Sequence, residues 1–414
     1  MKRIITVIFL TVIVYLYLHN PILAFTGGTG LIKLLYIVAL FFFLKNMGLT
    51  RATFRRYGKE STLFIILVFY AIIRGVLGGE FTLSYAHIIL FIECFILPCV
   101  FSAYWIKNKL TAKDFIQLLL IVSSVAAVIS TLCVVIPSFG SYVRFQLLYM
   151  QKDSFLAEAL FRGFGISEEL TSGYGYVQAF CFVLGLRYIK ENKWFIFFMP
   201  LVILSVALNA RTGIIIMAIG ILLHFLTLKK MKMALSSVVV IFVLIGGAIL
   251  FFSSLDLSED TIGYVQDFFD EASLFAENKD VSDARTANVL FNEMIIFPRD
   301  FMEWIFGRGY SLFSAKVGNS DIGYIIQLNY GGLIYVFIWA MILLRLFVRM
   351  RRTCFDKFIP LFLFVGVLLL NVKGNTFSNG STFRFLMLIY FVLTSQSKNF
   401  FINNKNNTVK VLSD

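Results

Sequence analysis

Charged residues are scarce in this chain of 414 amino acids: they make up 15% of it, whereas hydrophobic residues make up 59%. The mean hydropathy is +0.84. A soluble domain needs a polar surface, and about a quarter of its residues are typically charged. The composition therefore excludes an ordinary soluble domain and predicts a chain whose surface is largely in contact with lipid, as in a polytopic membrane protein.

Cysteine and histidine are also rare, with five and three residues. The cysteines lie in apolar segments or in a basic loop, so no disulfide is expected within the long polar loops. They are Cys94, Cys99, Cys133, Cys181 and Cys354. The sequence has no CxxC pair, histidine cluster, Walker loop or Rossmann fingerprint, and we expect neither a metal nor another cofactor. His19, His87 and His224 are expected in the core or at the membrane interface.

The net charge of +13 invites a nucleic-acid interpretation. The basic residues, however, form short clusters between apolar segments and do not gather on one polar domain. Such clusters are typical of segments that orient a protein in a bilayer. We therefore expect no nucleic-acid partner.

Twelve apolar segments approach the length of about 20 residues that a helix needs to cross a bilayer. They are 4–22, 31–45, 61–78, 83–106, 114–136, 174–189, 194–210, 213–228, 234–254, 322–345, 358–372 and 383–397. Basic residues cluster in every second connection, which marks the cytoplasmic side. The expected fold is all-α, with about twelve transmembrane helices and both termini cytoplasmic. The segment after Lys2 and Arg3 could also be a signal peptide, but the many later segments favour a retained helix.

Two long polar loops lie between these segments on the extracytoplasmic side. The larger one is too long to be a simple connector. The expected parts are helices 1–5 in 1–136, a smaller loop in 137–173, helices 6–9 in 174–254, a larger loop in 255–321, helices 10–12 in 322–397 and a cytoplasmic tail in 398–414. Periodicity predicts two amphipathic helices in the larger loop, one over Ile262–Phe275 and one over Leu290–Phe297, both against the membrane surface.

Arginines on the outer side are the most informative charges, because positive charge is disfavoured there. They are Arg74, Arg144, Arg162, Arg211, Arg285, Arg299, Arg308 and Arg384. Guanidinium groups bind phosphate oxygens in bidentate fashion, so this set indicates a lipid-linked phosphate or diphosphate; the alternative is pairing with outer acids or lipid headgroups. Arg211 lies in the short turn Asn209-Ala-Arg-Thr-Gly213, where Gly213 is expected to permit a tight turn.

Acidic residues near the same surface are candidates for a general base. Asp321 lies where the larger loop enters the tenth segment, and Glu168 and Glu169 occupy a comparable place in the smaller loop. The alternative role for Asp321 is that of a helix cap. Glu93 lies deeper, within the fourth segment, where a neutral carboxyl or a pair with Arg74 is expected, in a structural or gating role.

Together these patterns resemble the O-antigen polymerase (Wzy-type) and O-antigen ligase superfamily of bacterial membrane glycosyltransferases, which are GT-C-like. Arg162 and Gly173 match its Arg-x10-Gly pattern, which is absent from the larger loop. The turn at Arg211, the motif Ser282-Asp-Ala-Arg285, the turn Phe306-Gly-Arg-Gly-Tyr310 and the segment Ser320–Tyr335 are also similar to it. Ligases carry a histidine eleven positions before the glycine of that last segment; here Asp321 precedes Gly332, which favours a polymerase.

The resemblance implies a polymerase that joins undecaprenyl-diphosphate-linked repeat units at the periplasmic face of the inner membrane. Arg162, Arg211 and Arg285 would bind the diphosphate, with Arg308 and Arg384 as further candidates, and Gly173, Gly213 and Gly332 would shape the backbone. Asp321, Glu168 or Glu169 would be the base. Expected partners are the lipid-linked donor and acceptor, membrane lipids, and candidate chain-length regulator and flippase proteins. The alternatives are an O-antigen ligase, a lipid-linked oligosaccharide flippase or other transporter, and a non-enzymatic envelope scaffold.

Overall fold

The computed structural model describes residues 2–78, 80–148, 163, 165–167, 172–209, 211–228, 246, 263, 293–310, 312, 320–377 and 380–396, and every regular element in these ranges is a helix. The longer helices are α1 (Lys2–His19), α2 (Ile32–Lys45), α3 (Met47–Arg56), α4 (Gly58–Gly78), α5 (Phe81–Phe91), α6 (Leu97–Lys107), α7 (Ala112–Val135), α10 (Ser172–Arg187), α11 (Met199–Asn209), α12 (Arg211–Thr227), α17 (Gly323–Thr353), α18 (Phe358–Leu370) and α19 (Ser381–Ser395). The short ones are η1 (Ala24–Thr26), η2 (Ile92–Ile96), α8 (Pro137–Tyr142), η3 (Val143–Leu147), η4 (Lys193–Phe197) and α16 (Phe301–Phe306).

Four of the described helical stretches are long and apolar enough to cross a membrane: Gly58–Gly78, Ser84–Lys107, Ala112–Val135 and Gly323–Thr353. A fifth is possible if α2 and α3, which meet at a bend of 105°, form one broken span. Shorter apolar helices accompany them. This all-α architecture indicates a multi-pass membrane protein, because a helix satisfies its own backbone hydrogen bonds in lipid. Eleven of the twelve predicted segments coincide with described helices, and 234–254 lies outside the described residues apart from residue 246.

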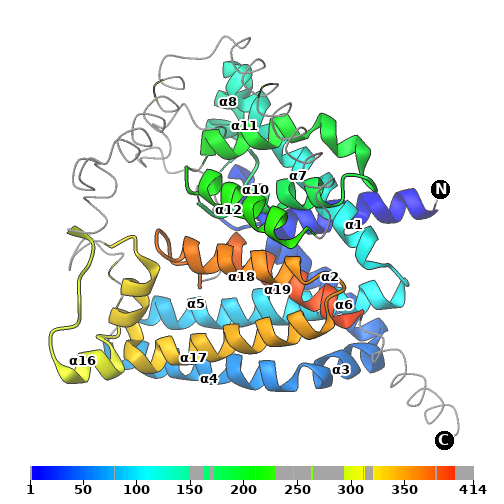
Figure 1. Ribbon diagram of the computed structural model, residues 1–414. Coiled ribbons are helices and arrows are strands. Elements are labelled where there is room, and N and C mark those ends of the chain that lie inside the picture. Colours follow the sequence, from blue (N-terminus) through cyan, green and yellow to red (C-terminus); the bar gives the residue numbers. More distant parts are fainter. Residues whose placement is uncertain are drawn as a thin grey trace, which may run out of the picture.

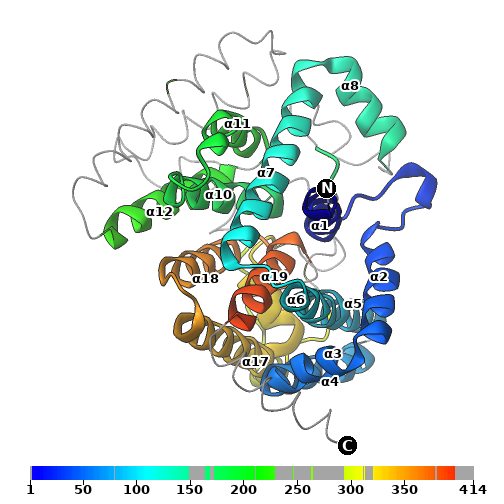
Figure 2. The same ribbon diagram turned by 90° about the vertical axis from the view of Figure 1, so that its right-hand side faces the viewer.

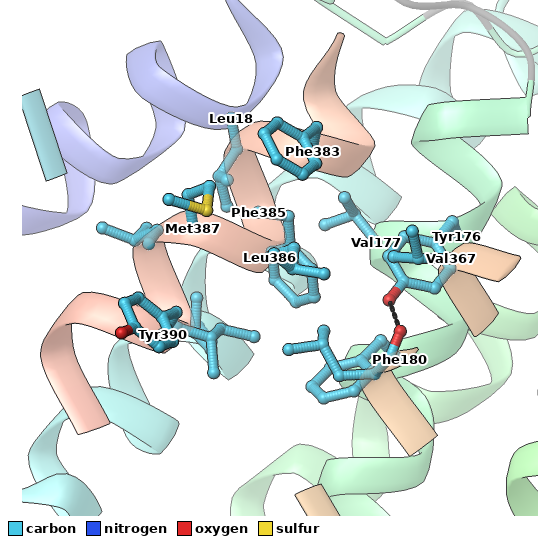
Figure 3. Packing of buried hydrophobic residues seen from close by; sticks show 14 of the residues in the cluster. Leu18, Tyr176, Val177, Phe180, Val367, Phe383, Phe385, Leu386, Met387 and Tyr390 are labelled. Carbon is cyan, nitrogen blue, oxygen red and sulfur yellow. Dashed lines mark hydrogen bonds between the residues drawn. The ribbon is translucent and has the colours of Figure 1, made fainter. Parts of the chain in front are cut away.

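Helix α19 is the centre of the bundle. All of its residues from Ser381 to Ser395 are buried, and it contacts α1, α6, α10 and α17. Figure 2, which looks along α17 and α5, shows α19 surrounded by its neighbours. In the close-up, Phe385 and Leu386 of α19 face Val177 and Phe180 of α10 (Figure 3). In lipid, close packing of this kind is a main source of helix association.

The bundle has two distinct ends (Figure 1). We call one the α16 end, because α16 lies there beside the end of α4, and the other the α3 end. Helices α4, α5 and α17 run between these two ends in Figure 1.

Helix α17 is broken near its start. Gly332 has φ +65° and ψ −167°, which is not helical, so a short arm, Gly323–Gly331, precedes the long part of α17. The break frees backbone carbonyls that need new donors. The amide of Arg308 donates to the carbonyl of Asn329 at 2.6 Å, and the amide of Gly309 to that of Tyr330 at 2.9 Å. The predicted continuous tenth span, 322–345, therefore starts with a separate arm and continues to Thr353.

The prediction of a helix over Leu290–Phe297 is wrong for its last residues, since residues 294–298 are not helical. Side chains from distant parts of the sequence donate to carbonyls that would accept from backbone amides in a helix. Ser320 donates to the carbonyl of Met294 at 2.7 Å and Asn329 to that of Ile296 at 2.7 Å. Pro298 further disfavours helical backbone in the residue before it. The helix here is α16, which Asp300 caps by accepting from the amide of Glu303. The other predicted helix, Ile262–Phe275, lies outside the described residues apart from residue 263.

An ion pair joins α10 to the connection between α17 and α18 at the α3 end. The guanidinium of Arg187 donates to both carboxylate oxygens of Asp356, at 2.5 and 2.9 Å, and the Tyr188 hydroxyl donates to it at 2.6 Å. Burial opposes ionisation of Asp356, but the bonds from Arg187 and Tyr188 and from the Phe358 amide outweigh it, so its pKa lies below the usual range. The ionised form is therefore favoured by folding.

We expect Asp356→Asn to lower the free energy of unfolding by about 2 kcal/mol at neutral pH, because it weakens charge-assisted hydrogen bonds. A carboxyl whose folded pKa is depressed contributes stability above its unfolded pKa of about 3.9 and loses it as the pH falls through the folded pKa. The difference in melting temperature between wild type and variant should therefore shrink below about pH 4. A difference that is the same at pH 7 and at the lowest tolerated pH would contradict this.

Candidate functional site

Three helices start side by side at the α16 end. A Cβ placed on Gly213 in the first turn of α12 would lie 3.1 Å from the backbone of Gly175 in the first turn of α10. The ring of Tyr176 in α10 lies 5.9 Å from that of Phe385 in α19. We call this place the helix-start junction. The positive ends of the three helix dipoles point toward the same region, which favours an anion.

The structure gives Gly213 a different role from the predicted one. It lies inside α12, and its φ is not positive. Its lack of a side chain lets α12 approach both α10 and α11, because a Cβ would lie 3.1 Å from the backbone of Gly175 in α10 and 2.8 Å from the side chain of Val206 in α11. Close packing of α12 against two helices, and not a tight turn, therefore explains the glycine. Gly173 is buried in the first turn of α10 at the same junction.

A residue next to Arg162 and a residue near Arg211 are both hydrogen-bonded to the side chain of Ser130 in α7. The Ser130 hydroxyl donates to the carbonyl of Gly163 at 2.6 Å and accepts from the side-chain amide of Asn209 at 3.0 Å. Arg162 precedes Gly163, and Arg211 is the first residue of α12, two positions after Asn209. The structure thus brings together Gly163 and Asn209, which are near neighbours in the sequence of two arginines 49 positions apart.

Some of the predicted site lies beyond what the structure describes. Arg162, Glu168, Glu169 and Arg285 lie outside the described residues, and Arg211 is described only in its backbone. The part of these residues in binding or catalysis remains a prediction.

Arg384 lies in the first turn of α19 and is 1% exposed. Its guanidinium Nη1 lies 3.3 Å from Oε2 of Glu93, and the Tyr36 hydroxyl donates to Oε1 of Glu93 at 2.6 Å. Glu93 belongs to the π-helical turn η2, and such turns are frequent at functional sites. The suggested partner of Glu93, Arg74, is not the one found, since Arg74 donates instead to the carbonyl of Gly307 at 2.7 Å.

A second place of interest is the contact between the turn at Gly307 and Gly309 and the break in α17; we call it the glycine junction. Gly307 and Gly309 have positive φ angles of 73° and 80°. A Cβ on Gly78 would lie 2.4 Å from the carbonyl oxygen of Gly309. The Tyr70 hydroxyl donates to the carbonyl of Gly331 at 2.7 Å. Backbone therefore packs directly on backbone here, which only glycine permits.

The Arg308 side chain makes hydrogen bonds to residues close to it in the sequence. Its Nε donates to Glu303 at 2.8 Å and its Nη2 to the carbonyl of Phe297 at 3.1 Å, and it is 5% exposed. The Arg299 amide and the Arg308 guanidinium hold the pKa of the Glu303 carboxyl below its usual range. These contacts favour a structural role for Arg308, and its predicted contact with diphosphate remains a prediction.

Asp321 stands just before α17, but it does not cap the helix. The N-cap is Ile322, with no side-chain hydrogen bond. Among the described residues, Asp321 has no hydrogen-bond or ion-pair partner, and it is partly exposed. The alternative role of a capping carboxylate is therefore not the one observed.

Sequence reasoning missed several residues of the two junctions. Ser130 was not predicted as a site residue because a serine in an apolar helix is common, and Asn209 was named only as part of the turn that contains Arg211. Polar residues inside a membrane segment are nevertheless expensive unless they have a partner, and that signal could have found them. Tyr70 and Tyr330 bear no charge and gave no signal; the Tyr330 hydroxyl donates to the carbonyl of Ala71 at 2.9 Å.

In the described part of the chain, no group of three or more His, Cys, Asp or Glu residues is close enough to hold a metal ion. No protein-family model and no curated protein matches the sequence. The chemistry of the two junctions must therefore be inferred from the residues themselves.

Proposed function

We propose that the protein is a polysaccharide polymerase of the O-antigen type, which joins undecaprenyl-diphosphate-linked repeat units. In this proposal about twelve helices cross the bacterial inner membrane, both termini are cytoplasmic, and the α16 end faces the periplasm. The α3 end carries the basic residues Arg55, Arg56, Arg351 and Arg352, which agrees with the preference of Lys and Arg for the cytoplasmic side.

The single observation that carries the proposal is the helix-start junction. Three helix N-termini, the first residue of α12, which is Arg211, and the buried Arg384 are all found there. Such a region is suited to bind a diphosphate, which carries several negative charges in a small volume. Arg162 and Arg285 would complete the set from the two loops.

The reaction is a displacement at the anomeric carbon of the donor glycan. A hydroxyl oxygen of the acceptor sugar forms the new glycosidic bond, the bond from the anomeric carbon to the phosphate oxygen breaks, and undecaprenyl diphosphate leaves. Negative charge develops on that leaving group, where arginines stabilise the transition state most effectively. The hydroxyl proton passes to a carboxylate. Asp321, which has no partner among the described residues, suits this role, and Glu168 and Glu169 are the alternatives.

We expect Arg211→Lys, like Arg211→Ala, to abolish most chain growth, by a factor of about 100 or more. Lysine keeps the charge but lacks the planar fork that binds two phosphate oxygens. The measurement is the length distribution of surface glycan in a deletion strain that carries each variant, with immunoblots for protein in the membrane. Arg51→Lys in α3, at the opposite end of the bundle, is the matched control. Near-normal ladders from Arg211→Lys would remove Arg211 from the site.

A transport function is the second candidate, because Glu93 and Arg384 form a buried ion pair within the helix bundle. Intramembrane charges of this kind often mark a translocation path. The deletion strain separates the possibilities. A polymerase predicts single repeat units on lipid A core without long ladders. Accumulation of lipid-linked units in the cytoplasmic leaflet would favour a flippase, and long glycans that never reach lipid A core would favour a ligase.

A further inference from the structure

His19 is the last residue of α1 and is 1% exposed. The centroid of its ring lies 4.6 Å from that of Tyr15 in the same helix and 5.6 Å from that of Tyr174 in the first turn of α10. Its Nε2 atom is buried and has no hydrogen-bond partner among the described residues. Buried polar atoms nearly always have such a partner, so a histidine left in this state indicates a group that the described residues do not provide.

The neighbours of His19 hold it at the helix-start junction. The Ser167 hydroxyl donates to its carbonyl at 3.3 Å, and the Tyr15 hydroxyl donates to the carbonyl of Ile166 at 3.0 Å. The positive charge of Arg384 is near enough to interact electrostatically with the imidazole ring. Leu18, the residue before it, lies against α19 beside Phe383 (Figure 3). The imidazole is therefore fixed next to the region where the three helices start.

We propose that Nε2 of His19 donates a hydrogen bond to a phosphate oxygen of the diphosphate bound at the helix-start junction. This inference rests on the proposed function, and it adds a side chain from α1 to the arginines that would bind the diphosphate. A neutral imidazole has one N–H donor, and phosphate oxygens are acceptors. The proton is on Nε2 in this arrangement. Because the ring is already packed between two tyrosines, little ordering entropy is lost on binding.

The test is the affinity of the purified full chain, in detergent, for geranylgeranyl diphosphate, measured by calorimetry. We expect His19→Phe to raise the dissociation constant about tenfold, because the ring is kept and the donor is lost. His19→Gln, whose amide nitrogen can take the place of Nε2, should remain within about threefold of wild type. His224→Phe, at the α3 end of α12, is the control, and each variant is checked by melting temperature.

A second measurement uses the unaltered protein, which has three histidines. Nitrogen NMR of imidazole-labelled protein should show the Nε2 signal of His19 move on addition of the diphosphate, while the signals of His87 and His224 stay. An unmoved His19 signal, or equal affinities of wild type and His19→Phe, would overturn the inference and leave the proposed function intact. Failure of the wild-type protein to bind the diphosphate would overturn both.

Discussion

Replacing Arg384 by methionine is expected to abolish chain growth and to lower the stability of the protein by about 3–5 kcal/mol, because it leaves the carboxylate of Glu93 buried without its cation. Glu93 is 3% exposed and Arg384 1%. Both groups are therefore buried within the helix bundle, Arg384 on α19 and Glu93 on η2.

The double variant Glu93→Gln with Arg384→Met separates stability from function. A buried ion pair can often be replaced by neutral groups of similar size without loss of stability, and glutamine keeps an oxygen that can accept from the Tyr36 hydroxyl. We therefore expect the melting temperature to return close to that of wild type while chain growth stays absent. Restored ladders in the double variant would show that Arg384 serves only to neutralise Glu93, and they would remove it from the diphosphate site.

Gly332→Ala is expected to cost about 3 kcal/mol or more and to remove most activity. Its φ of +65° is a conformation that residues with a side chain rarely adopt. A Cβ at this position would also lie 2.3 Å from the carbonyl oxygen of Ile305 and 2.6 Å from the amide nitrogen of Gly307. Both contacts are with backbone, so no side chain can move away to make room. The break in α17 and the arm that follows Asp321 would have to shift.

Gly48→Ala provides the matched control. Gly48 lies within α3, and a Cβ there would meet no atom within 4 Å. We expect this change to be neutral or to stabilise the protein by up to about 1 kcal/mol, since alanine is the better helix former. The measurements are melting temperature in detergent and glycan ladder length for both variants. Equal stability of Gly332→Ala and wild type would contradict the geometry of the glycine junction.

The apolar segments illustrate what a sequence of this kind can predict. Their helical state follows from local composition, since a lipid-exposed backbone has to satisfy its own hydrogen bonds. The end of the helix predicted over Leu290–Phe297 shows the limit. Its periodicity was helical, but the carbonyls of Met294 and Ile296 are bound by Ser320 and Asn329. These donors come from residues 26 and 33 positions away, and local periodicity contains no information about them.

Gly332 and Arg384 were both identified from the sequence, but without their physical roles. The sequence marked Gly332 as part of a motif, and only the fold shows that it breaks α17 and packs on Ile305. It marked Arg384 as an outer charge, and only the fold gives it Glu93 as a partner, 291 positions away. Gly213 was expected to permit a turn and instead permits the approach of two helices.

The sequence by itself determined that the protein is an all-α membrane protein and where most of its helices lie, because hydropathy and backbone hydrogen bonding act over short stretches of chain. Tertiary structure alone decided which polar groups are paired, where α17 breaks and which helix starts adjoin. These features depend on contacts between distant segments, and a buried charge or carbonyl takes whichever partner the packing of the helices brings near.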